Sequence, residues 1–283
     1  MQTGSDFFPV LGIQEFNEKL SNSCDLLYHE LRGLRHIGSP HKHDFFIIIL
    51  FEKGGGTHFI DFVAYPIKDR QVHLLFPGQV HEWQIQESSI GYQLMISRDW
   101  FEQLVPYLRF TVSYYQNHPV IEIKSEEYNL LLSEFTSIQE ELSRQDTFWD
   151  VVQVRVKLIA LLLSKCAAEK FIDFGKYSAT PIVSKFLAYI DQYFREERSV
   201  SFYADKLNIS ANYLNIVTKK ALDIPASALI QDRLILEAKR LLKSSELSVK
   251  DIVYSLGFYD HANFSKFFKK KTGMTPSQFK TQK

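Results

Sequence analysis

The stretch SVKDIVYSLGFYDHANFSKFFKKKTGMTPSQF, at 248–279, decides the architecture of the C-terminal part of the chain. An earlier stretch, SVSFYADKLNISANYLNIVTKK at 199–220, repeats its pattern at an offset of 49 and then 50 residues. In each copy an amphipathic segment precedes a short break, at Asn208 or Gly257, and a second helical segment follows. Ser210 and Asp260 stand where the N-cap of that second helix belongs. The sequence therefore predicts two helix-turn-helix units.

The second helix of each unit has an apolar side, predicted to be core, and a polar side, predicted to face DNA. The expected core residues are Tyr213, Leu214 and Val217 in one unit and Phe264, Phe267 and Phe268 in the other. Asparagine pairs with adenine, lysine or histidine with guanine, and small apolar side chains with the thymine methyl group. Lysines at the helix end suit phosphate contacts, although a solvated lysine face has the same pattern. The expected DNA-contacting residues are Ala211, Asn212, Asn215, Ile216, Lys219, Lys220, His261, Ala262, Ser265, Lys266, Lys269 and Lys270, with Lys271 as a further phosphate contact.

The segment 225–243 separates the two units and carries leucine and alanine at helical intervals. We expect one rigid helix, which at 1.5 Å per residue would be about 27 Å long. Successive major grooves on one face of DNA lie about 34 Å apart. A helix of this length can therefore set the two units in neighbouring grooves.

Charge is divided unevenly along a chain whose formal net charge is zero. Residues 181–283 hold 17 basic and 10 acidic side chains, and the first 180 residues hold 16 basic and 23 acidic ones. The C-terminal part thus has the charge expected of a domain that meets double-stranded DNA.

The first 120 residues have the pattern of a β-rich domain. Short β-branched or aromatic runs occur at 45–51, 57–62, 71–76 and 90–96, separated by turn signals. Three glycines at 54–56 predict a tight hairpin between the first two runs. This spacing is typical of a small barrel or sandwich, a shape that offers a pocket.

Apolar residues recur every three to four positions at 128–142 and again at 149–166, which predicts two helices. Their apolar stripes can pack on the β-domain, on each other, or on the same helices of a second subunit, and we expect a homodimer. The mixed, polar segment 171–181 is the predicted boundary. The fold class is therefore α+β, with a β-domain at 1–120, a helical connector at 121–175 and an all-α domain at 181–281.

Cys24 and Cys166 have no metal-ligand or CxxC spacing, and no basic start or long apolar run begins the chain, so we expect a cytoplasmic protein. The longest apolar run, at 158–163, is too short to span a membrane and is interpreted as a buried helix face. No Ser/His/Asp set, phosphate loop or paired-carboxylate spacing predicts an enzyme.

The C-terminal part closely resembles the AraC/XylS family of bacterial transcription regulators. The resemblance covers about 181–280 and includes RLILEAKRLL at 233–242 and the matching residues Leu256, Gly257, Phe258, Phe264, Phe268, Lys269, Gly273, Thr275 and Pro276. It implies transcription activation through contact with RNA polymerase. It also implies that base contacts fall on Asn212, Asn215, Ile216, His261, Ala262, Ser265 and Lys266. The first unit matches less closely, with Asp223 in place of glycine, and Val253 replaces a small alanine in the second.

The β-domain resembles a cupin, the usual sensor of this family, through HKHDFF at 41–46 and LLFPGQVHEW at 74–83. Metal cupins gather an HxH pair, a glutamate and a later histidine around one ion. His41, His43 and His81 are present here, but Ile47 and Ile48 occupy the expected glutamate region. We therefore expect no metal and no cofactor, and assign an unidentified small-molecule effector to the pocket residues His43, Phe45, Phe62, Phe76, His81 and Trp83.

Two alternatives stay open for the β-domain. Three histidines alone hold iron in thiol dioxygenases, so the chain can be a cupin enzyme with an accessory helical domain. The aromatic side chains can also be barrel core only, in a DNA-binding regulator that takes no small ligand.

Overall fold

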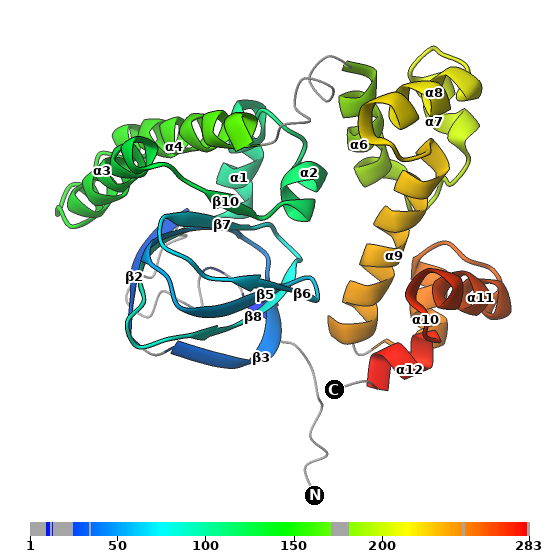
Figure 1. Ribbon diagram of the computed structural model, residues 1–283, viewed down its shortest axis with the longest axis horizontal. Helices are drawn as coiled ribbons and strands as arrows, with labels where there is room; N and C mark the ends of the chain where they lie inside the picture. Colours follow the sequence, from blue (N-terminus) through cyan, green and yellow to red (C-terminus); the bar gives the residue numbers. More distant parts are fainter. Residues whose placement is uncertain are drawn as a thin grey trace, which may run out of the picture. The chain divides into compact units, whose positions relative to one another are not determined.

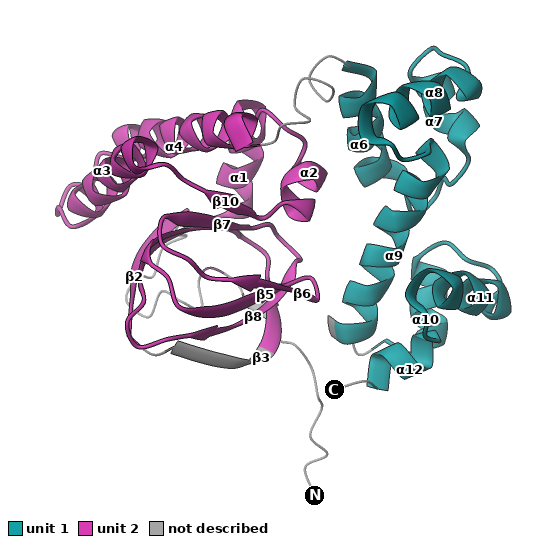
Figure 2. Cartoon of the chain, viewed as in Figure 1, with its two compact units in different colours: residues 1–8, 173–283 teal, residues 9–172 magenta. Residues whose placement is uncertain are grey.

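The computed structural model describes residues 10–11, 13, 25–33, 35–170, 181–244 and 247–281. The chain divides into two compact units, an N-terminal unit of residues 9–172 and a C-terminal unit of residues 173–283 together with 1–8 (Figure 2). Cys24 lies outside the described residues, as does the predicted boundary at 171–181 except for its last residue.

The N-terminal unit is built on two five-stranded sheets, which confirms the predicted β-domain (Figure 1). All pairings are antiparallel except that of β1 with β3. The first sheet has the order β1 (Val10–Leu11), β3 (Arg35–His43), β8 (Val80–Ile85), β5 (Gly56–Ile60) and β6 (Val63–Pro66). The second has the order β10 (Val120–Glu122), β7 (Gln71–Leu75), β4 (Phe46–Lys53), β9 (Ile90–Ile96) and β2 (Leu26–Arg32).

Strand β4 is central to the second sheet and is buried on both faces, as its continuous apolar run predicts. One face contributes Ile47, Ile49 and Phe51 to the core that also holds Trp83 and Ile85 of β8. Phe46, on the other face, packs against the ring of Phe101 in a helix outside the sheet, at a centroid distance of 4.8 Å.

The prediction of a tight hairpin at 54–56 is wrong, because β4 and β5 belong to different sheets. The glycines serve instead where the chain crosses from one sheet to the other. A Cβ on Gly54 would lie 2.3 Å from the backbone of Lys68, and one on Gly56 would lie 1.9 Å from the carbonyl oxygen of Gln84. The positive φ of Gly55 and Gly56 also favours glycine.

Short helical elements, α1 (Arg98–Leu104), η2 (Val105–Tyr107) and α2 (Val112–Asn117), follow β9. None of them was predicted, since three to seven residues are too few to show a helical period. Ser97 and Thr111 cap α1 and α2 by accepting backbone N–H bonds. Their buried residues, Phe101 and Tyr115, contact the aromatic residues of the second sheet.

Two long helices, α3 (Ser125–Leu142) and α4 (Trp149–Lys170), fall where the periodicity predicts them and pack against each other, and α4 also packs against β10 (Figure 1). Arg155 of α4 donates to Glu134 of α3 at 2.7 Å. The interpretation of 158–163 as a buried face is wrong in part. Leu158 and Leu161 are 40% and 50% exposed.

The C-terminal unit is entirely helical where it is described. Each predicted helix-turn-helix appears, the first as α7 and α8 and the second as α10 and α11, with α9 between them. The bounds are α6 (Pro181–Tyr193), α7 (Val200–Lys206), α8 (Ala211–Leu222), α9 (Ala226–Ser244), α10 (Val249–Ser255), α11 (His261–Thr272) and α12 (Pro276–Thr281).

The two N-caps are formed as predicted. Ser210 accepts from the N–H of Tyr213 at 3.1 Å and Asp260 accepts from that of Ala262 at 2.8 Å. Each recognition helix, α8 or α11, ends on a left-handed residue, Asp223 with φ 56° or Gly273 with φ 81°. The departure from glycine at Asp223 is thus accommodated, since aspartate tolerates this conformation better than most residues.

Candidate nucleic-acid interface and sensor pocket

Helix α9 is the scaffold that joins the two helix-turn-helix units. It is one helix of 19 residues, close to the predicted 225–243, and is therefore about 28 Å long. Arg233 of α9 donates to Asp191 of α6 at 2.9 Å and to Glu237 at 3.1 Å. Arg195 reaches Glu237 at 2.7 Å. Burial alone raises the pKa of Glu237, but these neighbouring arginines hold it below its ordinary value. The carboxylate therefore stays charged and joins α9 to the segment that follows α6, while the pair of Arg233 and Asp191 joins α9 to α6 itself.

The recognition helices present matching faces to solvent. Leu214 and Thr218 of α8, and Phe264 and Phe268 of α11, are fully buried. Because a helix turns 100° per residue, three positions of each helix lie opposite this core. They are Asn212, Ile216 and Lys219 in α8, and Ala262, Lys266 and Lys269 in α11, all exposed. Lys220, Lys270 and His261 are exposed as well, while Ala211 is half-buried.

Figure 1 shows α8 and α11 near opposite ends of α9. The exposed faces of the two recognition helices therefore belong to one compact unit.

The assignment of Tyr213 to the core is wrong, because this side chain is 48% exposed. Thr218 occupies the core instead, and its hydroxyl donates to the carbonyl of Asn215 at 3.1 Å. The second copy of the repeat held the signal for this, since Asn263, the counterpart of Tyr213, is polar and exposed. Tyr213 and Asn263 join the candidate DNA-facing surface.

Asn215 has a structural partner that the sequence did not reveal. Its side-chain oxygen accepts from the N–H of Ala226, the first residue of α9, at 3.1 Å. Its amide nitrogen donates to the carbonyl of Ala211 at 3.3 Å. A base contact by Asn215 therefore competes with the contact that joins α8 to the start of α9.

Lys271 and Ser265 are likewise partly committed inside the unit. Lys271 donates to Asp232 of α9 at 2.9 Å, so the predicted phosphate contact competes with this ion pair. Ser265 is half-buried, with its hydroxyl 3.5 Å from a ring nitrogen of His261.

The turn of the second unit is held by the segment that connects α6 to α7. Arg198 donates to the carbonyl of Leu256 at 2.7 Å, and its guanidinium lies 3.6 Å from the centre of the Phe258 ring. A Cβ on Gly257 would lie 2.2 Å from the carbonyl oxygen of Arg195, so only glycine fits there. The segment that precedes the first helix-turn-helix unit therefore contacts the turn of the second directly.

The six predicted effector residues are not all brought together. The rings of His43, Phe45, His81 and Trp83 lie in contact within the N-terminal unit, with His43 and Phe45 at 4.5 Å and His81 and Trp83 at 5.5 Å between centroids. Phe76 packs on the other side of the second sheet, against Phe46 and Tyr115. Phe62 lies just after β5, is 39% exposed and has a positive φ of 72°.

A connected row of buried histidines crosses the interior between the sheets. Nε2 of His43 lies 2.8 Å from Nε2 of His81, and Nδ1 of His81 lies 3.0 Å from Nε2 of His58. Nδ1 of His58 lies 3.0 Å from Nδ1 of His73, which belongs to β7 of the second sheet. His41 completes the group, with its ring 4.3 Å from that of His81.

His58 and His73 were not among the predicted site residues. Both stand in the predicted runs at 57–62 and 71–76. Pairing of β5 with β8 brings His58 beside His81, and His73 reaches His58 from the other sheet, so no local pattern reports either contact. Burial lowers the pKa of His58 and His81 well below the ordinary value, and it lowers that of His73 to about 3. These three rings are therefore neutral at physiological pH.

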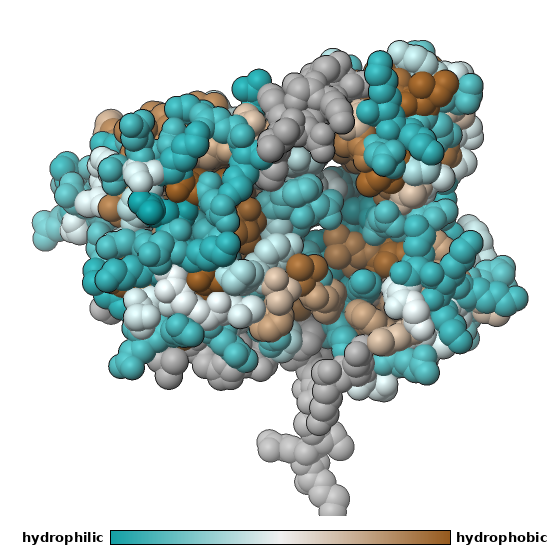
Figure 3. Space-filling model, in the orientation of Figure 1, coloured by the Kyte–Doolittle hydropathy of each residue, from teal (hydrophilic) through white to brown (hydrophobic). Residues whose placement is uncertain are grey.

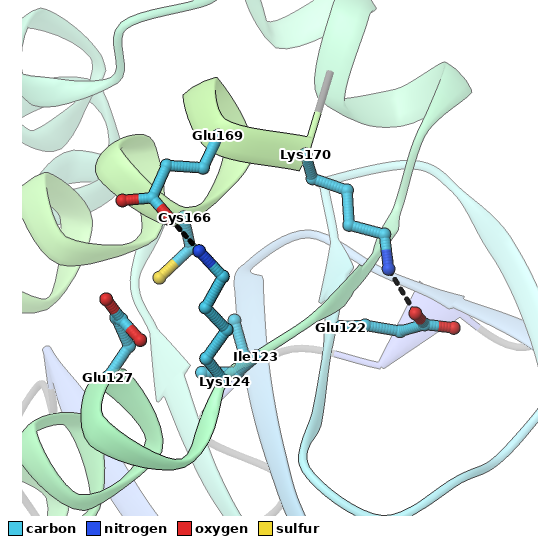
Figure 4. Close-up of a pocket in the computed structure, with 7 residues that line it drawn as sticks. All are labelled: Glu122, Ile123, Lys124, Glu127, Cys166, Glu169 and Lys170. Carbon is cyan, nitrogen blue, oxygen red and sulfur yellow. Dashed lines mark hydrogen bonds and ion pairs between the residues drawn. The ribbon is translucent and has the colours of Figure 1, made fainter. Parts of the chain in front are cut away.

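A separate pocket of about 280 Å³ lies between β10, the start of α3 and the end of α4 (Figure 4). Its charged residues are largely paired, Lys124 with Glu169 at 2.6 Å and Lys170 with Glu122. Burial raises the pKa of the Cys166 thiol to about 11, which makes that thiol unreactive. None of the six predicted effector residues lines this pocket. Its ion pairs hold the end of α4 against β10.

No helix in the described part of the chain is long and apolar enough to cross a membrane.

Comparison with known proteins agrees with the two units. A model described as an AraC-like ligand binding domain matches residues 23–99, and one described as a helix-turn-helix domain matches residues 203–282. The HTH-type transcriptional activator RhaS of Escherichia coli is 23% identical over 246 residues, which cover 83% of this chain and 85% of that one.

Two solved structures are also similar. The C-terminal domain of the two-component response regulator yesN from Fusobacterium nucleatum is 30% identical, covers 34% of this chain and 93% of its own, and has a TM-score of 0.33. Unsaturated fatty acid-bound ToxT from Vibrio cholerae is 17% identical, covers 93% and 97%, and has a TM-score of 0.44.

The chain is thus a transcription regulator in which a ligand-binding β-domain precedes a DNA-binding domain with two helix-turn-helix units. It belongs to the AraC family.

Proposed function

We propose that the chain activates transcription by placing α8 and α11 in two successive major grooves on one face of promoter DNA. The observation that carries this is the pair of exposed recognition faces at the two ends of one 19-residue helix. The readers would be Asn212, Ile216, Ala262 and Lys266, with Tyr213 and Asn263 beside them, and Ala211, Asn215, His261 and Ser265 at the margins. Lys219, Lys220, Lys269 and Lys270 would contact phosphates.

The N-terminal unit supplies control. A small effector in contact with His43, Phe45, His81 and Trp83 would change the affinity for DNA or for RNA polymerase. The indole N–H of Trp83 is buried and has no hydrogen-bond acceptor among the described residues, which supports a bound group with an acceptor atom. Phe62 and Phe76 lie apart from this group, and we assign them no direct contact.

Two copies of the chain would associate through α3 and α4. Val154, Leu158 and Leu161 are 63%, 40% and 50% exposed and follow one face of α4 at helical spacing, and Leu130 of α3 is 52% exposed. Figure 3 shows apolar atoms in brown over this helical layer. Such a stripe is suited to the same stripe of a second copy. We place this dimer in the bacterial cytoplasm, acting as a regulator and not as an enzyme.

The test is selection of bound fragments from genomic DNA, followed by footprinting on the recovered sites. Protection of two grooves one helical turn apart on one face is expected. Enrichment of no site, or binding equal to that on random DNA, would overturn the proposed function. Sedimentation of a Leu158→Glu, Leu161→Glu variant tests the dimer, with Val105→Glu, an exposed apolar residue outside α3 and α4, as the matched control.

A further inference from the structure

We propose that the N-terminal unit binds one divalent transition-metal ion through His41, His43 and His81, and that Gln71, His73 and His58 form a hydrogen-bond chain that orients His81 toward it. The inference rests on the proposed function only where it names this ion as the signal that controls DNA binding.

The donor and acceptor roles in the hydrogen-bond chain are fixed at Gln71, the end farthest from His81. The side-chain oxygen of Gln71 accepts from the backbone N–H of Lys68 at 2.8 Å, which identifies that atom as the oxygen. The same oxygen lies 3.2 Å from Nε2 of His73. An amide oxygen can only accept, so His73 carries its proton on Nε2 and leaves a lone pair on Nδ1.

The remaining protons then follow one by one. Nδ1 of His73 accepts, so His58 carries its proton on Nδ1 and accepts at Nε2. His81 therefore carries its proton on Nδ1 and donates it to His58. The outcome is a lone pair on Nε2 of His81, directed at His43. A buried imidazole with its second nitrogen committed to a hydrogen bond is the usual form of a metal-ligating histidine.

The three ligand residues fit one ion. One nitrogen from each of His41, His43 and His81 lies within 4.8 Å of the others, and all three residues are buried. Imidazole nitrogens bind zinc at about 2.0 to 2.1 Å, so an ion between the three rings would draw these atoms closer together. Three imidazoles suit zinc, copper, iron and nickel rather than magnesium or calcium. Water or an anion would complete the shell, beside the buried indole N–H of Trp83.

The missing carboxylate, with Ile47 and Ile48 in its place, is the reason that the sequence predicts no metal. The structure places His58 and His73 behind His81, where they do the orienting that a charged neighbour does in many metal sites. The set therefore offers a neutral ligand group with a built outer shell.

The experiment is titration of the full-length chain, stripped with chelator, with Co²⁺ followed by visible absorption and with Zn²⁺ in competition. One ion per chain is expected, and His41→Ala and His81→Ala should abolish its binding. His58→Phe keeps a ring but removes the acceptor for His81, so affinity should fall about 10- to 100-fold. His58→Gln restores an acceptor and should recover most of that loss. His29→Phe, on the exposed side of β2, is the matched control.

Circular dichroism and melting temperature accompany each variant. Should His58→Phe fail to fold, Gln71→Leu tests the hydrogen-bond chain at the end farthest from His81. It should weaken Co²⁺ binding by less than tenfold. Absence of bound metal in wild type overturns the site. Equal affinities for wild type, His58→Phe and Gln71→Leu overturn the orienting chain.

Footprinting with and without Zn²⁺ separates this inference from the proposed function. Footprints without metal binding would support the DNA-binding regulator and overturn the metal site. Metal binding without any footprint would support the metal site and overturn the regulator. If the protein binds both and neither changes the affinity for the other, only the ion's role as signal is overturned.

Discussion

The first helix-turn-helix unit turns through Asn208 and ends its recognition helix on Asp223, whereas the second uses Gly257 and Gly273 at the equivalent places. The two units thus have the same backbone conformation but differ in the residues at their turns and in the side chains that their recognition helices expose. The first exposes Ile216 where the second exposes Lys266. The difference teaches that a repeated fold can expose side chains of unlike chemistry at equivalent positions, here one apolar and one cationic.

The largest effect is expected from the turns. Gly257→Ala forces a Cβ toward the carbonyl of Arg195 and also strains a φ of 73°, so it should cost about 3 kcal/mol of unfolding free energy. Asn208→Ala, at a φ of 55°, should cost only about 1 kcal/mol. Denaturant unfolding of the two variants measures both, and equal losses would refute the claim that the second turn is the tighter one.

Base reading comes next. Lys266→Ala should weaken specific binding by about 1 to 3 kcal/mol, the usual worth of a good base contact. Ile216→Ala should cost less, since it removes only an apolar contact. Titration of each variant against a selected site and against random DNA measures both losses of affinity. An equal loss on both DNAs would make Lys266 a phosphate contact.

Asn215 allows a stabilising contact within the first unit to be distinguished from a base contact. Asn215→Ala removes the acceptor for the N–H of Ala226 and should lower stability by about 1 kcal/mol. Ser265→Ala, the equivalent change in the second unit, removes no such contact and should leave stability unchanged. Thermal melts of both variants test this. If Asn215→Ala melts like wild type yet changes the preferred sequence, Asn215 is a base reader after all.

The smallest effects are expected from the exposed lysines that end the recognition helices. Lys219→Ala and Lys269→Ala should each reduce the slope of log affinity against log salt by about 1, on specific and random DNA alike. Binding measured over a salt series gives the slopes. Unchanged slopes in both variants would remove these lysines from the phosphate contacts.

Local patterns predicted most of the C-terminal unit. N-caps such as Ser210, the two repeats and the helix between them depend on neighbours in sequence, and each formed as expected. Tyr213 was misplaced because an aromatic residue beside Leu214 resembles core, and the partner of Asn215 was missed because Ala226 belongs to the next element.

The N-terminal unit was harder to predict because its contacts are non-local. The glycines at 54–56 have hairpin chemistry, yet they join two sheets, and only the full strand order shows this. Phe62 and Phe76 lie apart from the other four predicted effector residues for the same reason. His58 joined His81 through the pairing of β5 with β8, and His73 joined His58 from the other sheet.

The most direct test of the account is a footprint of the wild-type protein on a selected site, with insertions of about 5 and about 10 base pairs between the two protected grooves. Because α9 fixes the separation of α8 and α11, both insertions should abolish simultaneous protection and leave one groove occupied. Undiminished protection of both grooves after either insertion would contradict the rigid two-unit reader.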